Sequence, residues 1–386
     1  MPVDPKLHLD ANIPWSEPAW LRGVPSPYYN ESHRTLQRRV RAVGTDDQKR
    51  RWLPGLFARE TSFSLGVTEP SGGSDVARLA TTAERTPDGS AYVVNGVKKW
   101  ITGTPWATHM TTAVRTRTTT TAGPRRASSP GESMGKGSSG ESMGKGGSTT
   151  TTTGDSTRDG ISLLVIPMDA PGVVHQKIHN SGQNAGGASY VYLENVRVPA
   201  DHLLGRENDG FRVVMQNFNR ERFLLTVACN RKARSCLAMA LQYATRRETF
   251  GRPLVRNQVI RRKLAELAHR IEAHWAWLEQ LAYQVSSSAS TSASGSRGGG
   301  WDDAAIASTV ALLKVQGGQL IELAAREAAQ VFGGAAYQKA GPGAAVEQIN
   351  RDLRMLVVGG GSEEIIADLA VRLELAMMGA LAAPKL

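Results

Sequence analysis

Cysteine is scarce in this 386-residue sequence, which contains only Cys229 and Cys236. The two residues are seven positions apart in a stretch with helical periodicity, so their Cα atoms would lie roughly 10 Å apart on one helix face. That separation is too large for a disulfide bond. No histidine cluster accompanies them, so a structural zinc site is not expected either. A reducing compartment fits this cysteine usage best.

Long apolar runs and targeting segments are also missing. No apolar run reaches the length that a membrane-spanning helix needs. Residues Met1 to Trp15 mix acids and bases without an apolar core, unlike a secretory signal or a mitochondrial presequence. The C-terminal Pro384-Lys385-Leu386 resembles the peroxisomal address Ser-Lys-Leu except at its first position. We therefore expect a cytoplasmic or peroxisomal protein without a membrane partner.

Acidic residues are outnumbered by basic ones, which gives a formal net charge of +11 and a pI near 9.8. The basic residues are dispersed, and no helix-turn-helix, zinc-finger or RNA-binding signature accompanies them, so no nucleic-acid partner is expected. A solvated basic surface is the simplest explanation of the charge. Such a surface also attracts anionic cofactors and substrates.

Periodicity divides the chain into three parts and predicts an α+β fold. Residues 1–60 are a Pro-rich opening with short helical pieces. Residues 61–200 contain short strands and turns, including Pro87-Asp88-Gly89 and a hairpin turn at Asn95-Gly96, as in a small barrel or sandwich. Residues 208–384 have helical periodicity typical of a four-helix bundle; its expected helices cover residues 211–249, 258–285, 301–332 and 363–378.

Two low-complexity segments interrupt this order. Residues 115–159 are rich in Thr, Ser and Gly and contain the sequence G-E-S-M-G-K-G twice, at 131–137 and 140–146. Residues 286–300 are rich in Ser and Gly. Both segments lack the apolar side chains needed to pack, so we expect disordered insertions.

Two elements of the β region carry candidate chemistry. The loop V67-T-E-P-S-G-G-S-D75 has small residues that let backbone N–H groups approach phosphate oxygens. The segment K99-W-I-T102 offers an aromatic face and a hydroxyl group at the end of a strand. Each element alone also has a purely structural interpretation: the first as a common Gly-Gly-Ser loop, and the second as a strand with a core tryptophan.

Together the two elements resemble the middle domain of the acyl-CoA dehydrogenase family, in which T-E-P-x-x-G-S-D precedes a hairpin ending in W-I-T. The resemblance implies bound flavin adenine dinucleotide (FAD). Thr68 and Thr102 would hydrogen-bond the flavin ring, with Val67 beside it and Trp100 packed against it. Ser74 would contact phosphate of the cofactor or of the substrate.

The helical half adds three matches to the same family. R247-E-T-F-G-R-P-L-V-R-N-Q258 resembles its R-x-x-F-G motif, Q330-V-F-G-G334 its adenosine-side motif, and R351-D-L-R354 with G359-G-G-S-E-E-I365 its closing loop and last helix. In the family the first motif reaches the FAD of a neighbouring subunit, so a homodimer or homotetramer is implied. The further FAD contacts implied are Arg247, Phe250, Gln258, Gln330, Gly333, Gly334, Ser362 and Glu364.

The family removes an α-proton from an acyl-CoA with a glutamate, in many members that of a Y-E-G-T loop. Gly360 stands at that place here. A minority of members carry the glutamate on the first bundle helix, where this sequence has N219-R-E-R-F223. The resemblance therefore implies Glu221 as the base, Arg222 as a substrate-site cation, and the Gly360 N–H as a donor to the thioester oxygen. The alternative is that Glu221 and Arg222 are ordinary residues near the start of a helix.

One departure from the family concerns the N-terminal helical domain. The segment H33-R-T-L-Q-R-R-V-R-A-V43 leads directly into G44-T-D-D-Q-K-R-R-W-L-P54, which resembles the last helix of that domain, so most of the domain is expected to be missing. The implied activity is α,β-dehydrogenation of an acyl-CoA, as in fatty-acid β-oxidation. Electrons would pass to an electron-transfer flavoprotein or to oxygen. An oxidase-like enzyme and an inactive remnant that only binds partners stay open.

Overall fold

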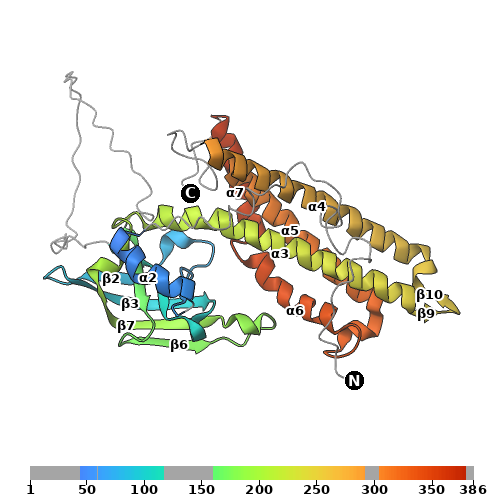
Figure 1. The fold of residues 1–386 in the computed structure, drawn as a ribbon, viewed down its shortest axis with the longest axis horizontal. Coiled ribbons are helices and arrows are strands. Elements are labelled where there is room, and N and C mark those ends of the chain that lie inside the picture. The colour runs from blue at the N-terminus through green and yellow to red at the C-terminus, as the bar shows by residue number, and fades with distance from the viewer. Residues whose placement is uncertain (1–43, 59, 117–159, 292–303, 380–386) are drawn as a thin grey trace, which may run out of the picture.

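The computed structural model describes residues 44–58, 60–116, 160–291 and 304–379. Within these ranges a sheet domain is followed by a bundle of long helices, and helix α3 (Gly210–Arg246) runs from the sheet domain through the bundle (Figure 1). This arrangement confirms the expected α+β fold with a C-terminal helical bundle. The repeated G-E-S-M-G-K-G sequences, the segment before Gly44 and the C-terminal tripeptide lie outside the described residues.

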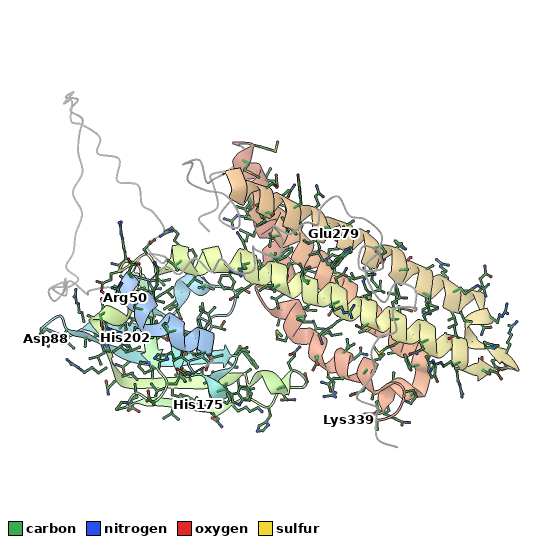
Figure 2. All side chains as sticks on the ribbon, viewed as in Figure 1. Arg50, Asp88, His175, His202, Glu279 and Lys339 are labelled. Atoms are coloured by element: carbon green, nitrogen blue, oxygen red, sulfur yellow. The ribbon has the colours of Figure 1, made fainter. Side chains whose placement is uncertain are left out.

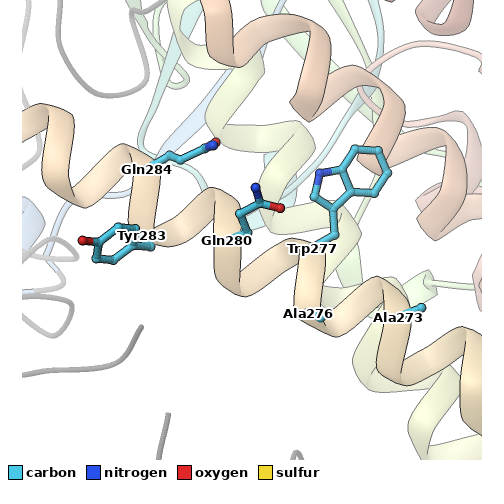
Figure 3. A pocket seen from close by; sticks show the side chains of 6 residues that line it. All are labelled: Ala273, Ala276, Trp277, Gln280, Tyr283 and Gln284. Carbon is cyan, nitrogen blue, oxygen red and sulfur yellow. The ribbon is translucent and has the colours of Figure 1, made fainter. Parts of the chain in front are cut away.

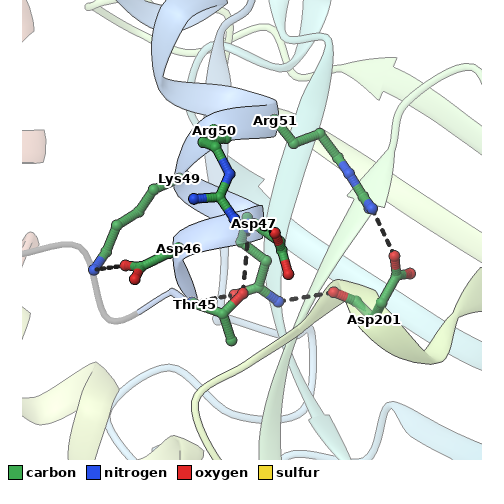
Figure 4. Close-up of polar contacts among 8 residues, drawn as sticks. Thr45, Asp46, Asp47, Lys49, Arg50, Arg51 and Asp201 are labelled. Carbon is green, nitrogen blue, oxygen red and sulfur yellow. Dashed lines mark hydrogen bonds and ion pairs between the residues drawn. The ribbon is translucent and has the colours of Figure 1, made fainter.

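Helix α2 (Asp46–Ala58) begins at a capping box. The hydroxyl of Thr45 accepts the N–H of Gln48 at 3.2 Å, and the Gln48 side chain accepts the N–H of Thr45 at 2.9 Å (Figure 4). The Gln48 amide also donates to the carbonyl oxygen of Asp201 at 2.8 Å. Trp52 packs edge-on against His202, with ring centroids 5.3 Å apart; Figure 2 labels His202 beside the helix. These contacts dock α2 onto the sheet domain.

The sheet domain contains one eight-stranded sheet with the order β6-β7-β3-β2-β4-β5-β8, in which β1 pairs with β4. Apolar side chains of β3, β4, β5 and β7 form its buried core. The strands are β1 (Phe63–Gly66), β2 (Thr82–Arg85), β3 (Ala91–Ile101), β4 (His109–Arg115), β5 (Ile161–Pro167), β6 (Val173–Lys177), β7 (Ser189–Pro199) and β8 (Leu203–Leu204).

The predicted hairpin turn at Asn95-Gly96 is wrong, because β3 passes straight through these residues. The chain turns earlier, between β2 and β3, where Gly89 N–H donates to the carbonyl of Thr86 at 2.8 Å. Gly96 instead belongs to an irregularity in the β3–β7 register. A Cβ atom there would lie 2.7 Å from the Cα of Thr81. The glycine therefore permits a close backbone approach within a strand.

The bundle contains five helices among the described residues, one more than expected. They are α3, α4 (Gln258–Thr291), α5 (Ala304–Phe332), α6 (Ala344–Val358) and α7 (Glu363–Met377), and α5 contacts the other four. The unpredicted α6 follows Gly341-Pro342-Gly343 and buries one apolar face. Helix α4 extends to Thr291, so residues 286–291 are helical rather than irregular. Serine and alanine do not break a helix, and the first glycine of that segment is Gly295.

Helix α3 ends at Arg246, and residues 248–253 form a small hairpin of β9 (Glu248–Thr249) and β10 (Arg252–Pro253).

Cys229 and Cys236 lie buried on α3 as free thiols, and burial raises the pKa of each to about 12. No helix in the described ranges is long and apolar enough to cross a membrane.

A polar cluster lies within the bundle, where α3, α4 and α5 meet. The side-chain amide of Asn230 donates to Nδ1 of His274 at 2.9 Å, and the Thr226 hydroxyl lies 3.0 Å from Nε2. Gly317 makes room for this cluster, since a Cβ atom there would lie 2.3 Å from Oγ1 of Thr226. Burial lowers the pKa of His274 to about 4.

Candidate active site

The proposed base position on α3 and the closing loop between α6 and α7 meet in the structure. Arg222 is 9% exposed, and its Nε donates to the carbonyl oxygen of Gly360 at 2.9 Å. Burial lowers the pKa of Arg222, and the negative charge of Glu221 opposes that shift. Glu221 itself is half-buried. The helix turn that carries Glu221 and Arg222 is therefore in contact with Gly360, through the Arg222 side chain.

The backbone of Gly360 explains how the loop approaches α3. Its φ is +73°, in the left-handed region that favours glycine. A Cβ atom at this position would lie 3.2 Å from Cγ of Arg222 and 3.3 Å from Cδ1 of Leu225. A side chain at residue 360 would thus project against the turn of α3 that carries Arg222.

A second buried cation, Lys314 of α5, holds the same loop, and sequence reasoning missed it. Its Nζ donates to the carbonyl oxygen of Gly361 at 2.9 Å and also to that of Val357. Burial lowers the pKa of Lys314. Because C=O and the following N–H point in opposite directions in a trans peptide, the N–H groups of Gly361 and Ser362 point away from the two cations. Ser362 precedes α7 and makes no side-chain capping hydrogen bond, and Glu364 is exposed.

The loop of residues 67–75 in the sheet domain contains one partner of a buried ion pair that the sequence analysis also missed. Lys98 Nζ lies 2.7 Å from Oε1 of Glu69, and the two side chains are 0% and 3% exposed. Burial lowers the pKa of Lys98 to about 8, and Glu69 opposes this shift. Burial raises the pKa of Glu69, but the charge of Lys98 and hydrogen bonds bring it below its ordinary value. Glu69 follows Thr68 directly and Lys98 lies two residues before Trp100, so the pair joins the two segments that carry the predicted flavin contacts.

Thr68 is hydrogen-bonded to Lys99, the residue before Trp100. The carbonyl of Thr68 accepts the N–H of Lys99 at 2.9 Å. Trp100 has a φ of +64°, and its side chain is 51% exposed. Val67 is buried, whereas Ser74 and Thr102 are exposed. The structure therefore gathers the predicted flavin contacts at one end of β3.

This end of β3 is connected to α3 and α6. Val67 and Phe218 of α3 belong to one apolar cluster, and the Arg222 guanidinium lies 5.5 Å from the Phe218 ring centroid. The N–H of Gln183, in the β6–β7 loop, donates to Oδ1 of Asp352 at 2.7 Å. Asp352, from the R-D-L-R motif, thus has a role in joining the two domains that sequence alone did not reveal.

The remaining predicted cofactor residues lie at the other end of α3. Stacking of Tyr243 on Phe332, with centroids 4.3 Å apart, brings the ends of α3 and α5 together. Phe250 is 100% exposed with a φ of +52°. Cβ atoms added at Gly251, Gly333 or Gly334 would meet nothing within 4 Å, and Arg247, Gln258 and Gln330 are exposed.

These distal residues lie far from Glu221 of their own chain. Glu221 and Arg246 are 25 residues apart on one helix, which places them roughly 38 Å apart. The predicted contacts therefore form two separate groups in one protomer.

A shallow groove on the outer side of α4 includes none of the predicted residues. It is lined by Ala273, Ala276, Trp277, Gln280, Tyr283 and Gln284, which all come from α4 (Figure 3). One helix alone supplies no converging polar groups of the kind that fix a ligand. We assign it no role.

Comparison with known proteins defines the class. The profile of "Acyl-CoA dehydrogenase, C-terminal domain" matches residues 208–373, and that of the middle domain matches residues 64–129. A probable acyl-CoA dehydrogenase from Mycobacterium abscessus has a similar structure, with a TM-score of 0.66 and 32% identity, over 85% of this chain and 72% of the other. The chain therefore belongs to the acyl-CoA dehydrogenase family.

Two fungal relatives are similar over most of this chain. Acyl-CoA dehydrogenase AFT10-1 of Alternaria alternata is 38% identical over 85% of this chain and 65% of its own length. Acyl-CoA dehydrogenase apdG of Emericella nidulans is 29% identical over 94% of this chain and 95% of its own length. The chain thus matches about two thirds of the first relative and nearly all of the second.

Proposed function

We propose that this protein is an FAD-dependent acyl-CoA dehydrogenase in which Glu221 removes the α-proton of the substrate. The contact between Arg222 and Gly360 supports the proposal, because Arg222 adjoins Glu221 and Gly360 stands at the other position expected for the base. Only one of these positions holds a carboxylate here, that of Glu221. An α-proton next to a thioester needs such a positioned base.

The residues present fit the cofactor. Trp100 keeps a strained backbone and an exposed ring beside Thr68, and unusual backbone conformations of this kind concentrate at functional sites. The exposed loop with Gly73 and Ser74 offers room for phosphate, since a Cβ atom at Gly73 would meet nothing within 4 Å. When bound, FAD would accept the β-hydrogen of the acyl chain as hydride.

The remaining groups would position the substrate. The Glu221 carboxylate takes the α-proton onto one oxygen. The N–H of Gly360 donates to the thioester carbonyl oxygen, where negative charge develops as the proton leaves. Arg222 keeps the loop that carries this donor in place. The exposed phosphate groups of coenzyme A suit the basic surface of a chain with a net charge of +11.

The two separate groups of cofactor residues support a homodimer or a larger homo-oligomer. Arg247 lies beyond the far end of α3, and a guanidinium suits bidentate contact with pyrophosphate. We infer that this group completes the cofactor site of a second copy. The fully exposed Phe250 is also suited to an interface between protomers. A monomer that retains FAD in light scattering at micromolar concentration would refute this assembly.

Purified protein tests the proposed function directly. It should be yellow, release FAD on denaturation and lose its flavin absorption when a mixture of acyl-CoAs is added without oxygen. Reduction of an artificial dye supports a dehydrogenase that passes electrons to a flavoprotein acceptor, whereas rapid oxygen consumption supports an oxidase. Colourless protein that acquires no FAD on reconstitution would contradict the proposal and favour the inactive remnant.

A further inference from the structure

A β-bulge at the end of β3 turns two successive side chains to the same side of the sheet. In the pairing with β7, Lys98 lies opposite Val191 and Ile101 lies opposite Ser189, with a register shift between them. Lys99 and Trp100 therefore both face the single residue Tyr190. Lys98 and Ile101 are buried, whereas Lys99 is half-buried and Trp100 is exposed. A bulge redirects side chains in this way without ending the strand.

The ammonium group of Lys99 lies between two aromatic rings. Its Nζ is 4.9 Å from the ring centroid of Trp100 and 5.1 Å from that of Tyr190. Both distances are within the range of cation–π attraction. Tyr190 is itself stacked on Tyr192, with centroids 6.1 Å apart. One cation thus connects the Trp100 ring to an aromatic pair on β7.

We propose that Lys99 is a positioning residue that holds the Trp100 ring for the cofactor and keeps a positive charge beside it. The proposal rests on the proposed FAD site. Trp100 needs such support because half of its side chain is exposed and its backbone is strained. Reduction makes the bound cofactor more negative, so a nearby fixed cation favours the reduced form. Lys98, one residue earlier, cannot substitute, because it is paired with Glu69.

Three variants separate the position of the ring from the charge. Lys99→Gln removes the cation, and Lys99→Arg keeps it. Lys177→Gln is the control and removes an exposed cation from β6. Lys177 lies opposite Ser189 in the pairing with β7, so its side chain is on the other face of the sheet from Tyr190. FAD affinity of the apoprotein and the midpoint potential of the bound cofactor are measured for each variant. Acrylamide quenching of tryptophan fluorescence is also measured on the apoprotein. The same measurement on a Trp100→Phe variant is subtracted, so that the difference reports how accessible and mobile the Trp100 ring is.

Lys99→Gln should weaken FAD binding about threefold, as expected for losing an exposed cation–π contact, and should increase quenching of Trp100. It should also shift the reduction equilibrium toward the oxidised form by up to about tenfold, or ~30 mV for two electrons. Lys99→Arg and Lys177→Gln should resemble the parent. Equal effects of Lys99→Gln and Lys177→Gln, or none from Lys99→Gln, would overturn the proposal. If the parent binds no FAD, the proposed function fails, and unchanged quenching would then refute the positioning of Trp100 separately.

Discussion

Replacing Glu221 by glutamine tests the assignment of the base. The change keeps the size of the side chain but removes its ability to accept a proton. Glu221→Gln should keep FAD and acyl-CoA binding, and its rate of flavin bleaching should fall ~10²-fold or more, as expected for loss of a general base. Stopped-flow absorbance without oxygen measures this rate. Glu266→Gln on α4 is the control, since Glu266 only pairs with Arg270 in the structure.

The double variant Glu221→Gly/Gly360→Glu should recover only part of the lost rate. A non-glycine residue at the φ of +73° found for Gly360 costs about 1–2 kcal/mol. The new side chain must also fit against Arg222 and Leu225, 3.2 and 3.3 Å from its Cβ. A cost of that size reduces the population of the required loop conformation by about 5- to 30-fold. We therefore expect a rate roughly tenfold below the parent.

Two outcomes would refute the assignment. If Glu221→Gln bleaches the flavin at the parent rate, another group is the base. If the double variant binds FAD and acyl-CoA normally but is no faster than Glu221→Gly alone, the two positions do not face the same α-carbon. A Gly360→Glu single variant that retains parental FAD content shows that the loop tolerates the change.

Four further outcomes are expected. Arg247→Ala should lower FAD content without changing the helical circular dichroism, and an unchanged FAD content would contradict a pyrophosphate contact. Lys98→Met should lower the free energy of unfolding in urea by about 3–5 kcal/mol, because Glu69 is left buried and unpaired, whereas Arg51→Met breaks an exposed pair with Asp201 and a cation–π contact with Trp52 and should cost at most about 2 kcal/mol. Because His274 has a folded pKa of about 4 and an unfolded value near 6.5, its stabilising effect is complete above pH 6.5 and is lost as the pH falls toward 4, by up to about 3 kcal/mol; His274→Gln should flatten this part of a pH–stability curve. An N-terminal fluorescent fusion should give puncta that disappear when Leu386 is deleted, and diffuse fluorescence of the intact chain would exclude a peroxisomal address.

Local signals in the sequence predicted several elements correctly. The helix expected within residues 44–54 forms most of α2, because capping and charge at a helix N-terminus depend on neighbouring residues only. Helical periodicity located α3, α4, α5 and α7. The Asn95-Gly96 turn was wrongly predicted because the same dipeptide also suits a bulge. Here Gly96 lies against Thr81, a residue of the neighbouring segment just before β2. Contacts between distant segments decide such cases.

The candidate site shows the same limit. The motifs identified Glu221, Arg222 and Gly360, but not that Arg222 reaches the carbonyl of Gly360, 138 residues away in the sequence. The burial of Lys98 and of Lys314 was not predicted. A lysine is usually expected at the surface, and its burial follows only from the packing around it. The separation of the two cofactor groups required the length and course of α3, which no single motif contains.

Two buried cations hold the loop of three glycines that carries the proposed N–H donor. Gly359, Gly360 and Gly361 have no side chains that restrict their conformation, so the loop alone would be poorly ordered. Arg222 and Lys314 each lose hydration on burial, and they recover part of that cost by donating to the loop carbonyls. The directions of the Gly361 and Ser362 N–H groups are therefore set by α3 and α5, and the loop that carries the Gly360 N–H is held in place. Since Glu221 adjoins Arg222, the helix that fixes the loop also carries the proposed base, so a substrate carbonyl bound at Gly360 would be oriented relative to the Glu221 carboxylate.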